Sequence, residues 1–332
     1  MRRSRSCRRD LISLGPCRRG SLFVLSGFII YYIHHRDIGS PRRFRNYAVR
    51  RLTRIYPAFW VTLALVTAAT FIVHPSERIG DEAASAAIVQ SALLIPFTRP
   101  GQVNIVGVAW TLSHELLFYT FFGLVILSRR IGGVILGVWI AALLGARFFS
   151  TLLPPLNFLL HVKNLEFFIG MAVAKLLLDT HCRAGWRSAT GVVVLFVATA
   201  VVELRGGYDF LEAWPSLCYG AGAALMIFAR GSLEIEHRIF LIPRPLVFVG
   251  AASYSIYLIH FTIAVGLVKA AHVTGFTERL EPLLLFFTIA TAASCGGIVL
   301  YLTTERPLLR AAHRAFREGS TEPRSLTSSA AS

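Results

Sequence analysis

The sequence predicts an all-α protein, a polytopic bundle of transmembrane helices with about nine spans and one short re-entrant or interfacial segment. Two observations predict this fold. Of the 332 residues, 55% are hydrophobic and 16% are charged, whereas soluble domains contain about 45–50% apolar and about 25% charged residues. The apolar residues also come in blocks long enough to cross about 30 Å of hydrocarbon as helices. Helices are required there because a backbone in lipid must satisfy its own hydrogen bonds.

Nine apolar blocks are long enough to be spans: 21–35, 55–74, 106–127, 131–149, 158–178, 189–204, 210–229, 246–270 and 283–302. The segment 84–97 is shorter and more polar, so we expect it to dip into the membrane without crossing. Prolines such as Pro57 and Pro282 fall near the block ends, where a missing N–H does least harm. The blocks form one membrane domain, residues 21–310, followed by a polar tail, 311–332, which we expect to be cytoplasmic and disordered.

The charge distribution favours a membrane surface over nucleic acid as the partner. The formal net charge is +16, and all but three of the 34 basic residues are arginine. These arginines stand between the apolar blocks, where positive charge marks the cytoplasmic side. The five cysteines are scattered without a CxxC pair, so neither a disulfide framework nor a zinc site is predicted.

The arginine-rich segment 36–54 predicts the orientation of the spans. We expect this loop to be cytoplasmic, and the later arginine clusters then fall on the same side if 84–97 does not cross. The basic segment 1–20 breaks the pattern, because it would lie outside with several arginines. A helix before Gly20 would remove the conflict. We therefore expect residues 1–20 to reflect a mis-called start, a frame error or a truncation.

Two arginines at the start of the second span are candidate anion ligands. Arg51 and Arg54 are spaced i, i+3, which places them on one face of a helix. A guanidinium binds phosphate through two parallel hydrogen bonds. The same pair could equally anchor the span to lipid phosphates at the inner face, and the spacing leaves both interpretations open.

Glu115 is the principal polar candidate inside a span. It lies roughly nine residues into its block, where a carboxylate costs about 3 kcal/mol and is by default a functional candidate. Trp110, Glu115 and Tyr119 can share one helix face that looks into the bundle. Glu115 could bind a substrate hydroxyl or move a proton, or it could make a structural hydrogen bond to another helix. The neighbouring HELLF is not a zinc motif, because Phe118 stands where a second histidine is needed.

His260 is the second candidate, and it follows Tyr254 and Tyr257 on one helical stripe. Imidazole exchanges protons near neutral pH, which suits proton transfer, although a packed histidine bonded to a neighbour is equally compatible. Glu166, near a span start, could line the same cavity. For three other residues we expect structural roles. Ser26 and Gly27 would allow close helix packing, and Glu305 would form a surface ion pair with Arg306.

Six stretches in a fixed order carry a resemblance to a known family. They are SLFVLSGFII from Ser21, RRLTRIYP from Arg50, AWTLSHELLFY from Ala109, EFFIGMAVA from Glu166, ASYSIYLIH ending at His260 and TTERP ending at Pro307. Over about residues 21–310 the chain resembles the membrane acyltransferase family called acyltransferase 3. That family O-acylates sugars of surface polysaccharides and related small molecules. Members of that family have ten transmembrane helices, whereas we predict nine here, and the one without a counterpart is the first. In the family, that first helix carries a basic residue and then the histidine assigned as general base.

The resemblance implies a membrane O-acyltransferase whose donor substrate is acyl-CoA, with acetyl the expected acyl group. Arg51 and Arg54 would hold the donor phosphates, and His260 would be the best remaining base. The catalytic pair would be Glu115 and His260, with Trp110, Tyr119, Glu166, Tyr254 and Tyr257 binding substrate. We expect no tightly bound cofactor, no metal and no nucleic acid. The expected partners are acyl-CoA, a glycan or other hydroxyl acceptor and membrane lipids, in a multi-pass protein of the plasma or inner membrane.

Two alternatives stay open at this point. One is a proton-coupled transporter of a small polar solute, with Glu115 and His260 as the proton relay. The other is a catalytically impaired acyltransferase that lacks the first helix.

Overall fold

The structure is a computed structural model of the chain. It describes residues 20–73, 82–96, 104–146, 155–179, 213–235, 242–276 and 281–311, together with 190, 191, 194, 197 and 201. Every regular element within these ranges is helical, and none of them contains a strand. The predicted all-α fold is therefore confirmed.

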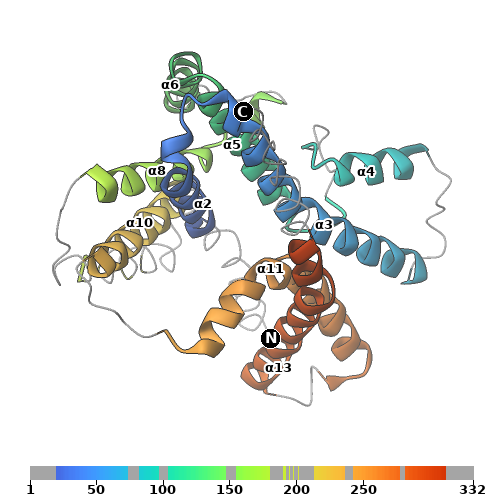
Figure 1. The fold of residues 1–332 in the computed structure, drawn as a ribbon. Coiled ribbons are helices and arrows are strands. Elements are labelled where there is room, and N and C mark those ends of the chain that lie inside the picture. Colours follow the sequence, from blue (N-terminus) through green and yellow to red (C-terminus); the bar gives the residue numbers. More distant parts are fainter. Residues whose placement is uncertain are drawn as a thin grey trace, which may run out of the picture. The chain divides into compact units, whose positions relative to one another are not determined.

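The helices follow the predicted spans (Figure 1). In chain order they are α2 (Gly20–His34), α3 (Pro41–Val73), α4 (Glu82–Ala92), α5 (Ala109–Leu127), α6 (Arg129–Gly145), α7 (Leu156–Leu159), α8 (Asn164–Asp179), α10 (Ala213–Ile235), α11 (Arg244–Val273) and α13 (Pro282–Leu300). A short turn of helix, η2 (His35–Asp37), follows α2, and a π-helical turn, η4 (Tyr301–Glu305), follows α13. The predicted span 189–204 lies largely outside the described residues.

Five helical stretches in the described part of the chain are long and apolar enough to cross a membrane. They are Pro41–Ile72, Ala109–Leu127, Leu156–Asp179, Arg244–Val273 and Pro282–Ala311. Their length satisfies the requirement of about 20 residues for about 30 Å of hydrocarbon. The chain is thus an all-α helical membrane protein.

The prediction that residues 36–54 form a loop is wrong for most of that segment. From Pro41 onward it is helical, and α3 continues without a break for 33 residues. Apolar length limits how much of a helix can lie in lipid, but it does not limit the helix itself, and arginine is a good helix former. Pro57 therefore lies inside α3 and not at its edge. Membrane helices tolerate such a proline because neighbouring groups satisfy the freed carbonyl.

The short helix α4 agrees with the expectation that 84–97 does not cross as a span. Its 11 residues amount to about 16 Å of helix, roughly half the hydrocarbon thickness. Two side chains of α3 hold its end: Trp60 Nε1 donates to the Ala92 carbonyl at 3.0 Å, and the Tyr56 hydroxyl donates to the Leu93 carbonyl at 3.4 Å.

Contacts divide the chain into two compact units. The first unit comprises residues 1–48, 98–100 and 113–241, and the second comprises residues 49–97, 101–112 and 242–332.

In the first unit, α2 packs against α8 and α10 (Figure 1). Two glycines permit this approach. A Cβ added to Gly27 would overlap the Phe167 carbonyl, and one added to Gly170 would overlap the Val24 carbonyl. The expectation that Gly27 serves close helix packing is therefore confirmed.

In the second unit, α11 packs along α13, and η4 contacts both helices (Figure 1). Gly297 permits this approach, because a Cβ there would lie 2.9 Å from the Ile256 Cβ. Pro245 and Pro282 stand in the first turns of α11 and α13, where no intrahelical N–H bond is lost.

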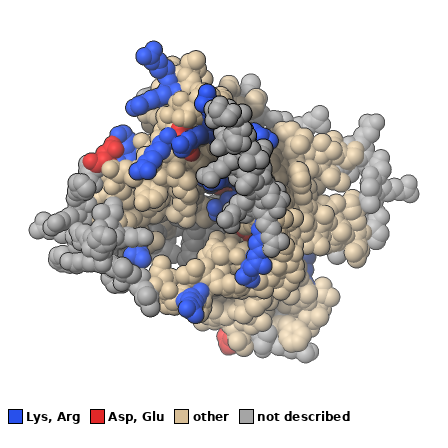
Figure 2. Space-filling view, viewed as in Figure 1, with Lys and Arg blue, Asp and Glu red and all other residues tan. Residues whose placement is uncertain are grey.

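The first half of α3 exposes several basic side chains. Arg42, Arg43, Arg45 and Arg50 are all exposed. The face drawn in Figure 2 likewise carries far more basic than acidic side chains. Such a surface is attracted to anionic lipid headgroups.

Candidate active site

Glu115 is the centre of a hydrogen-bonded cluster in the first unit. Its Oε1 accepts a hydrogen bond from Ser26 Oγ at 2.9 Å and another from the Tyr119 hydroxyl one helical turn away. The Tyr47 hydroxyl donates to the backbone carbonyl of Tyr119 at 3.0 Å, which fixes that turn of α5. The side chain of Glu115 is half-buried. The arrangement is a carboxylate oriented by two hydroxyl donors, able to accept a proton or to hold a hydroxyl.

Ser26 has a larger role than sequence spacing indicated. We expected this residue to serve helix packing, whereas its hydroxyl bonds Glu115. The two residues are 89 positions apart in the chain, so no local pattern pairs them. A polar side chain in an apolar block was the only available signal, because a hydroxyl in lipid requires a partner.

Glu166 lies in the first turn of α8 and is completely buried. Its Cγ would be 3.3 Å from a Cβ at Gly220 of α10, so that glycine provides the space the carboxylate occupies. A negative charge is favourable at a helix N-terminus.

An apolar groove of about 580 Å³ lies between α8 and α10 and is lined by residues such as Phe168 and Cys218. It contains none of the predicted site residues.

Sequence reasoning missed a buried polar pair, His114 and Asn164. The Asn164 amide nitrogen donates to the carbonyls of Phe158 and Leu159, at 3.2 and 3.1 Å. The amide oxygen therefore faces His114 Nδ1, at 2.9 Å. An amide oxygen only accepts, so Nδ1 carries the proton and Nε2 carries the lone pair of the neutral ring.

A second histidine, His161, stands beside this pair, with ring centroids 5.4 Å apart. The backbone N–H of Lys163 donates to His161 Nδ1 at 3.3 Å, so its ring proton is on Nε2 in the neutral form. Polar residues inside an apolar span were the signal for this cluster.

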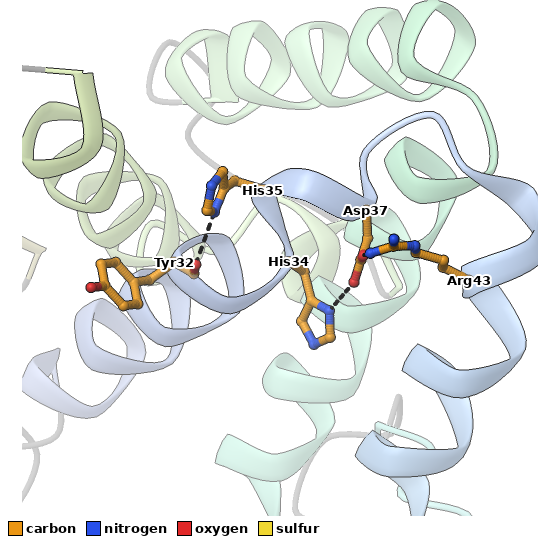
Figure 3. Close-up of polar contacts among 5 residues, drawn as sticks. All are labelled: Tyr32, His34, His35, Asp37 and Arg43. Carbon is orange, nitrogen blue, oxygen red and sulfur yellow. Dashed lines mark hydrogen bonds and ion pairs between the residues drawn. The ribbon is translucent and has the colours of Figure 1, made fainter. Parts of the chain in front are cut away.

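The turn between α2 and α3 is held by an acidic residue and two basic ones (Figure 3). His34 Nδ1 donates to Asp37 at 2.8 Å, and Arg43 donates to the other carboxylate oxygen. Partial burial acts to raise the pKa of the Asp37 carboxyl, but the hydrogen bonds and charges of His34 and Arg43 outweigh it and lower that pKa below its ordinary value. His34, which the sequence placed at a span end, is buried and packs edge-on to Tyr47.

Arg51 and Arg54 lie on α3 within the second unit. Arg51 is buried and Arg54 is exposed. Exposure leaves the guanidinium of Arg54 accessible to a phosphate, as the sequence predicts for an anion ligand. Its binding role stays a prediction.

The prediction that Glu305 forms a surface ion pair with Arg306 is wrong. Its side chain is buried and accepts a hydrogen bond from Ser255 Oγ at 2.6 Å. The positive charge of Arg54 also acts on it. The reason is tertiary packing. Because η4 packs on α11, Glu305 is removed from the surface that its place beside Arg306 at a helix end suggested.

The stripe of Tyr254, Tyr257 and His260 on α11 makes three defined hydrogen bonds. The Tyr254 hydroxyl donates to the Ile55 carbonyl at 2.8 Å. Thr111 uses its own proton on the Val108 carbonyl, so the Tyr257 hydroxyl donates to Thr111 Oγ1 at 2.6 Å. His260 Nδ1 donates to the Tyr257 carbonyl at 2.8 Å. The neutral His260 ring therefore has its lone pair on Nε2, as a base requires.

The structure brings some of the predicted site residues together. Glu115 and Tyr119 share one cluster, and Tyr257 and His260 share another. Trp110 is half-buried beside Thr111 at the start of α5. Among the described residues, no group of three or more His, Cys, Asp or Glu side chains is arranged to hold a metal ion.

Comparison with known proteins identifies the family. A family model described as an acyltransferase domain matches residues 11–303. The chain belongs to the acyltransferase 3 family. This membership makes the protein a membrane acyltransferase.

One curated relative of this acyltransferase is the exopolysaccharide production protein ExoZ of Rhizobium meliloti (strain 1021). The two sequences are 28% identical over 309 residues, which cover 90% of each chain. No solved structure matches the chain.

Proposed function

We propose that this acyltransferase is a multi-pass protein of the plasma or inner membrane that moves an acyl group, acetyl, from acyl-CoA to a hydroxyl of a sugar or cell-surface glycan. The observation that carries the proposal is the likeness to an exopolysaccharide production protein over 90% of both chains. A likeness of that extent, within an acyltransferase family, favours a glycan hydroxyl as the acceptor.

The proposed donor site is the inner end of the α3 span. Acyl-CoA presents a pyrophosphate and a 3′-phosphate to the cytoplasm. Arg54 is exposed one helical turn after Arg51, and a guanidinium can hold a phosphate through two hydrogen bonds. The surrounding membrane lipids attract the exposed arginines of α3, such as Arg42 and Arg50.

The proposed chemistry exchanges one ester for another. A base removes the acceptor hydroxyl proton, the alkoxide attacks the thioester carbonyl, and the CoA thiolate leaves and takes up a proton. The products are an O-acyl ester and free CoA. His260, with its lone pair on Nε2, is the proposed base. Glu115, oriented by Ser26 and Tyr119, is proposed to hold the acceptor or receive its proton.

Acetyl-CoA turnover in membranes tests these assignments. We expect Arg54→Ala to raise the KM for acetyl-CoA about 10–100-fold, because charge-assisted hydrogen bonds to phosphate are lost. We expect Glu115→Ala to lower kcat at least about 100-fold. Arg42→Ala, an exposed arginine on the same helix, is the matched control and should leave both constants unchanged. Unchanged turnover in the Arg54 and Glu115 variants would refute the assignments, and activity of the unaltered chain would exclude an impaired remnant.

A further inference from the structure

Glu305 is a buried carboxylate in an uncommon helical turn. It ends the π-helical segment η4 and is 6% exposed. A π turn contains one residue more than an α turn, so it rotates the following side chains by about 100° relative to a continuing α-helix. Single π turns inside helices are rare and often lie at functional sites. Here the turn places Glu305 against α11, where Ser255 Oγ donates to it.

Arg54 is the cation that acts on this carboxylate. No direct ion pair joins the two side chains in the described structure, and Arg54 is exposed whereas Glu305 is not. The bond from the Tyr254 hydroxyl to the Ile55 carbonyl holds α11 against α3 at the residues adjoining Ser255 and Arg54. A buried carboxylate needs hydrogen-bond donors or cations, and Ser255 and Arg54 supply one of each.

We propose that Glu305, anchored by Ser255, is a positioning residue that orders the Arg54 side chain to receive a phosphate of the CoA donor. The inference rests on the proposed function, because it assumes that Arg54 binds that donor. Arg54 is exposed and has many rotamers of its own. A fixed negative charge behind it favours those rotamers in which the guanidinium lies near Glu305 and turns its outer N–H groups to the cytoplasm.

Glu305 also repels the phosphate, so the sign of its effect depends on two magnitudes. Repulsion between charges about 8 Å apart in a water-like medium weakens binding about twofold. Loss of side-chain order in an arginine can weaken binding by up to about 30-fold. Ordering is therefore the larger effect, and removal of the Glu305 charge should weaken donor binding.

The test is a set of matched variants assayed for acetyl-CoA kinetics and for binding of CoA itself. Glu305→Gln keeps the shape of the side chain and an oxygen that Ser255 can bond, and it removes only the charge. We expect it to raise the KM for acetyl-CoA and the Kd for CoA about tenfold while kcat stays within about twofold. Ser255→Ala keeps the charge and loses one donor, so we expect a rise of about threefold. Glu281→Gln, an exposed carboxylate at the other end of α13, should have no effect.

Arg54→Ala in the same assays separates this inference from the proposed function. If Arg54→Ala leaves KM and Kd unchanged, the donor site itself is wrong. If Arg54→Ala weakens binding and Glu305→Gln does not, or tightens it, only the positioning role is overturned. The double variant should bind CoA no more weakly than Arg54→Ala alone, since an absent arginine cannot be ordered. Should Glu305→Gln fail to fold, Ser255→Ala tests the positioning role instead, and an unchanged KM and Kd in that variant would overturn it.

Discussion

Replacement of Gly27 by alanine should destabilise the protein far more than a single methyl group normally does. A Cβ on Gly27 would lie 2.8 Å from the Phe167 carbonyl carbon and 2.9 Å from the Phe167 Cα, whereas carbon atoms in contact are about 3.5–4.0 Å apart. The obstructing atoms belong to the backbone of α8 and cannot rotate away. The helices α2 and α8 would therefore have to separate by about 1 Å.

The expected magnitude follows from that separation. A gap of about 1 Å forfeits up to half of the dispersion energy between the facing atoms, and overpacked sites cost about 1–3 kcal/mol. Because backbone opposes backbone here, we expect the free energy of unfolding to fall by about 2–3 kcal/mol. For a chain of this size that corresponds to a fall in Tm of about 5 °C.

Thermal unfolding in detergent, followed by circular dichroism, measures this effect. Gly170→Ala is a second variant at the same contact, because its Cβ would lie 2.7 Å from the Phe28 backbone nitrogen. Gly137→Ala in α6 is the matched control, since a Cβ there meets nothing within 4 Å. The control should be neutral or stabilise by about 0.5–1 kcal/mol through helix propensity. If Gly27→Ala and Gly137→Ala unfold at the same temperature, the account of the α2–α8 contact is wrong.

Two further outcomes are expected from the polar contacts of the first unit. Asn164→Ala should lower the free energy of unfolding by about 2 kcal/mol, because the buried His114 ring loses the acceptor of its Nδ1 proton and the carbonyls of Phe158 and Leu159 each lose one donor. Ser294→Ala, whose hydroxyl bonds a carbonyl of its own helix, should cost about zero in the same assay. Asp37→Asn should lower stability at pH 7 by about 1 kcal/mol or less, since Arg43 is exposed. The folded state lowers the pKa of Asp37, so its contribution is complete above the ordinary pKa of about 3.9 and disappears as the pH falls through the lower folded value. The Tm difference between wild type and Asp37→Asn should accordingly shrink below about pH 4, and a difference that grows there would contradict the assignment.

Much of the fold was predictable because it depends on local composition. A block of apolar residues in lipid must be helical, and this rule placed helices such as α5 and α11 within a few residues of their observed ends. Relations within one helix were predictable for the same reason. Glu115 and Tyr119 stand one turn apart, and their hydrogen bond follows from helix geometry alone.

The extension of a helix beyond the lipid was less predictable than the span itself. The basic residues of 36–54 mark a membrane boundary, and we interpreted that boundary as a loop. The helix α3 instead runs through it from Pro41. Hydropathy reports which residues can lie in hydrocarbon, but the hydrogen-bonding of a helix outside lipid depends on propensity, for which arginine is favourable.

The sequence by itself determined the fold class, the helices and the side chains that share one face of a helix, because each of these follows from neighbours in the chain. Only the tertiary structure decided which polar groups meet. Ser26 reaches Glu115 across 89 positions and Ser255 reaches Glu305 across 50. A carboxylate or hydroxyl buried in an apolar protein must find a partner, but which one it finds depends on how helices distant in sequence pack together.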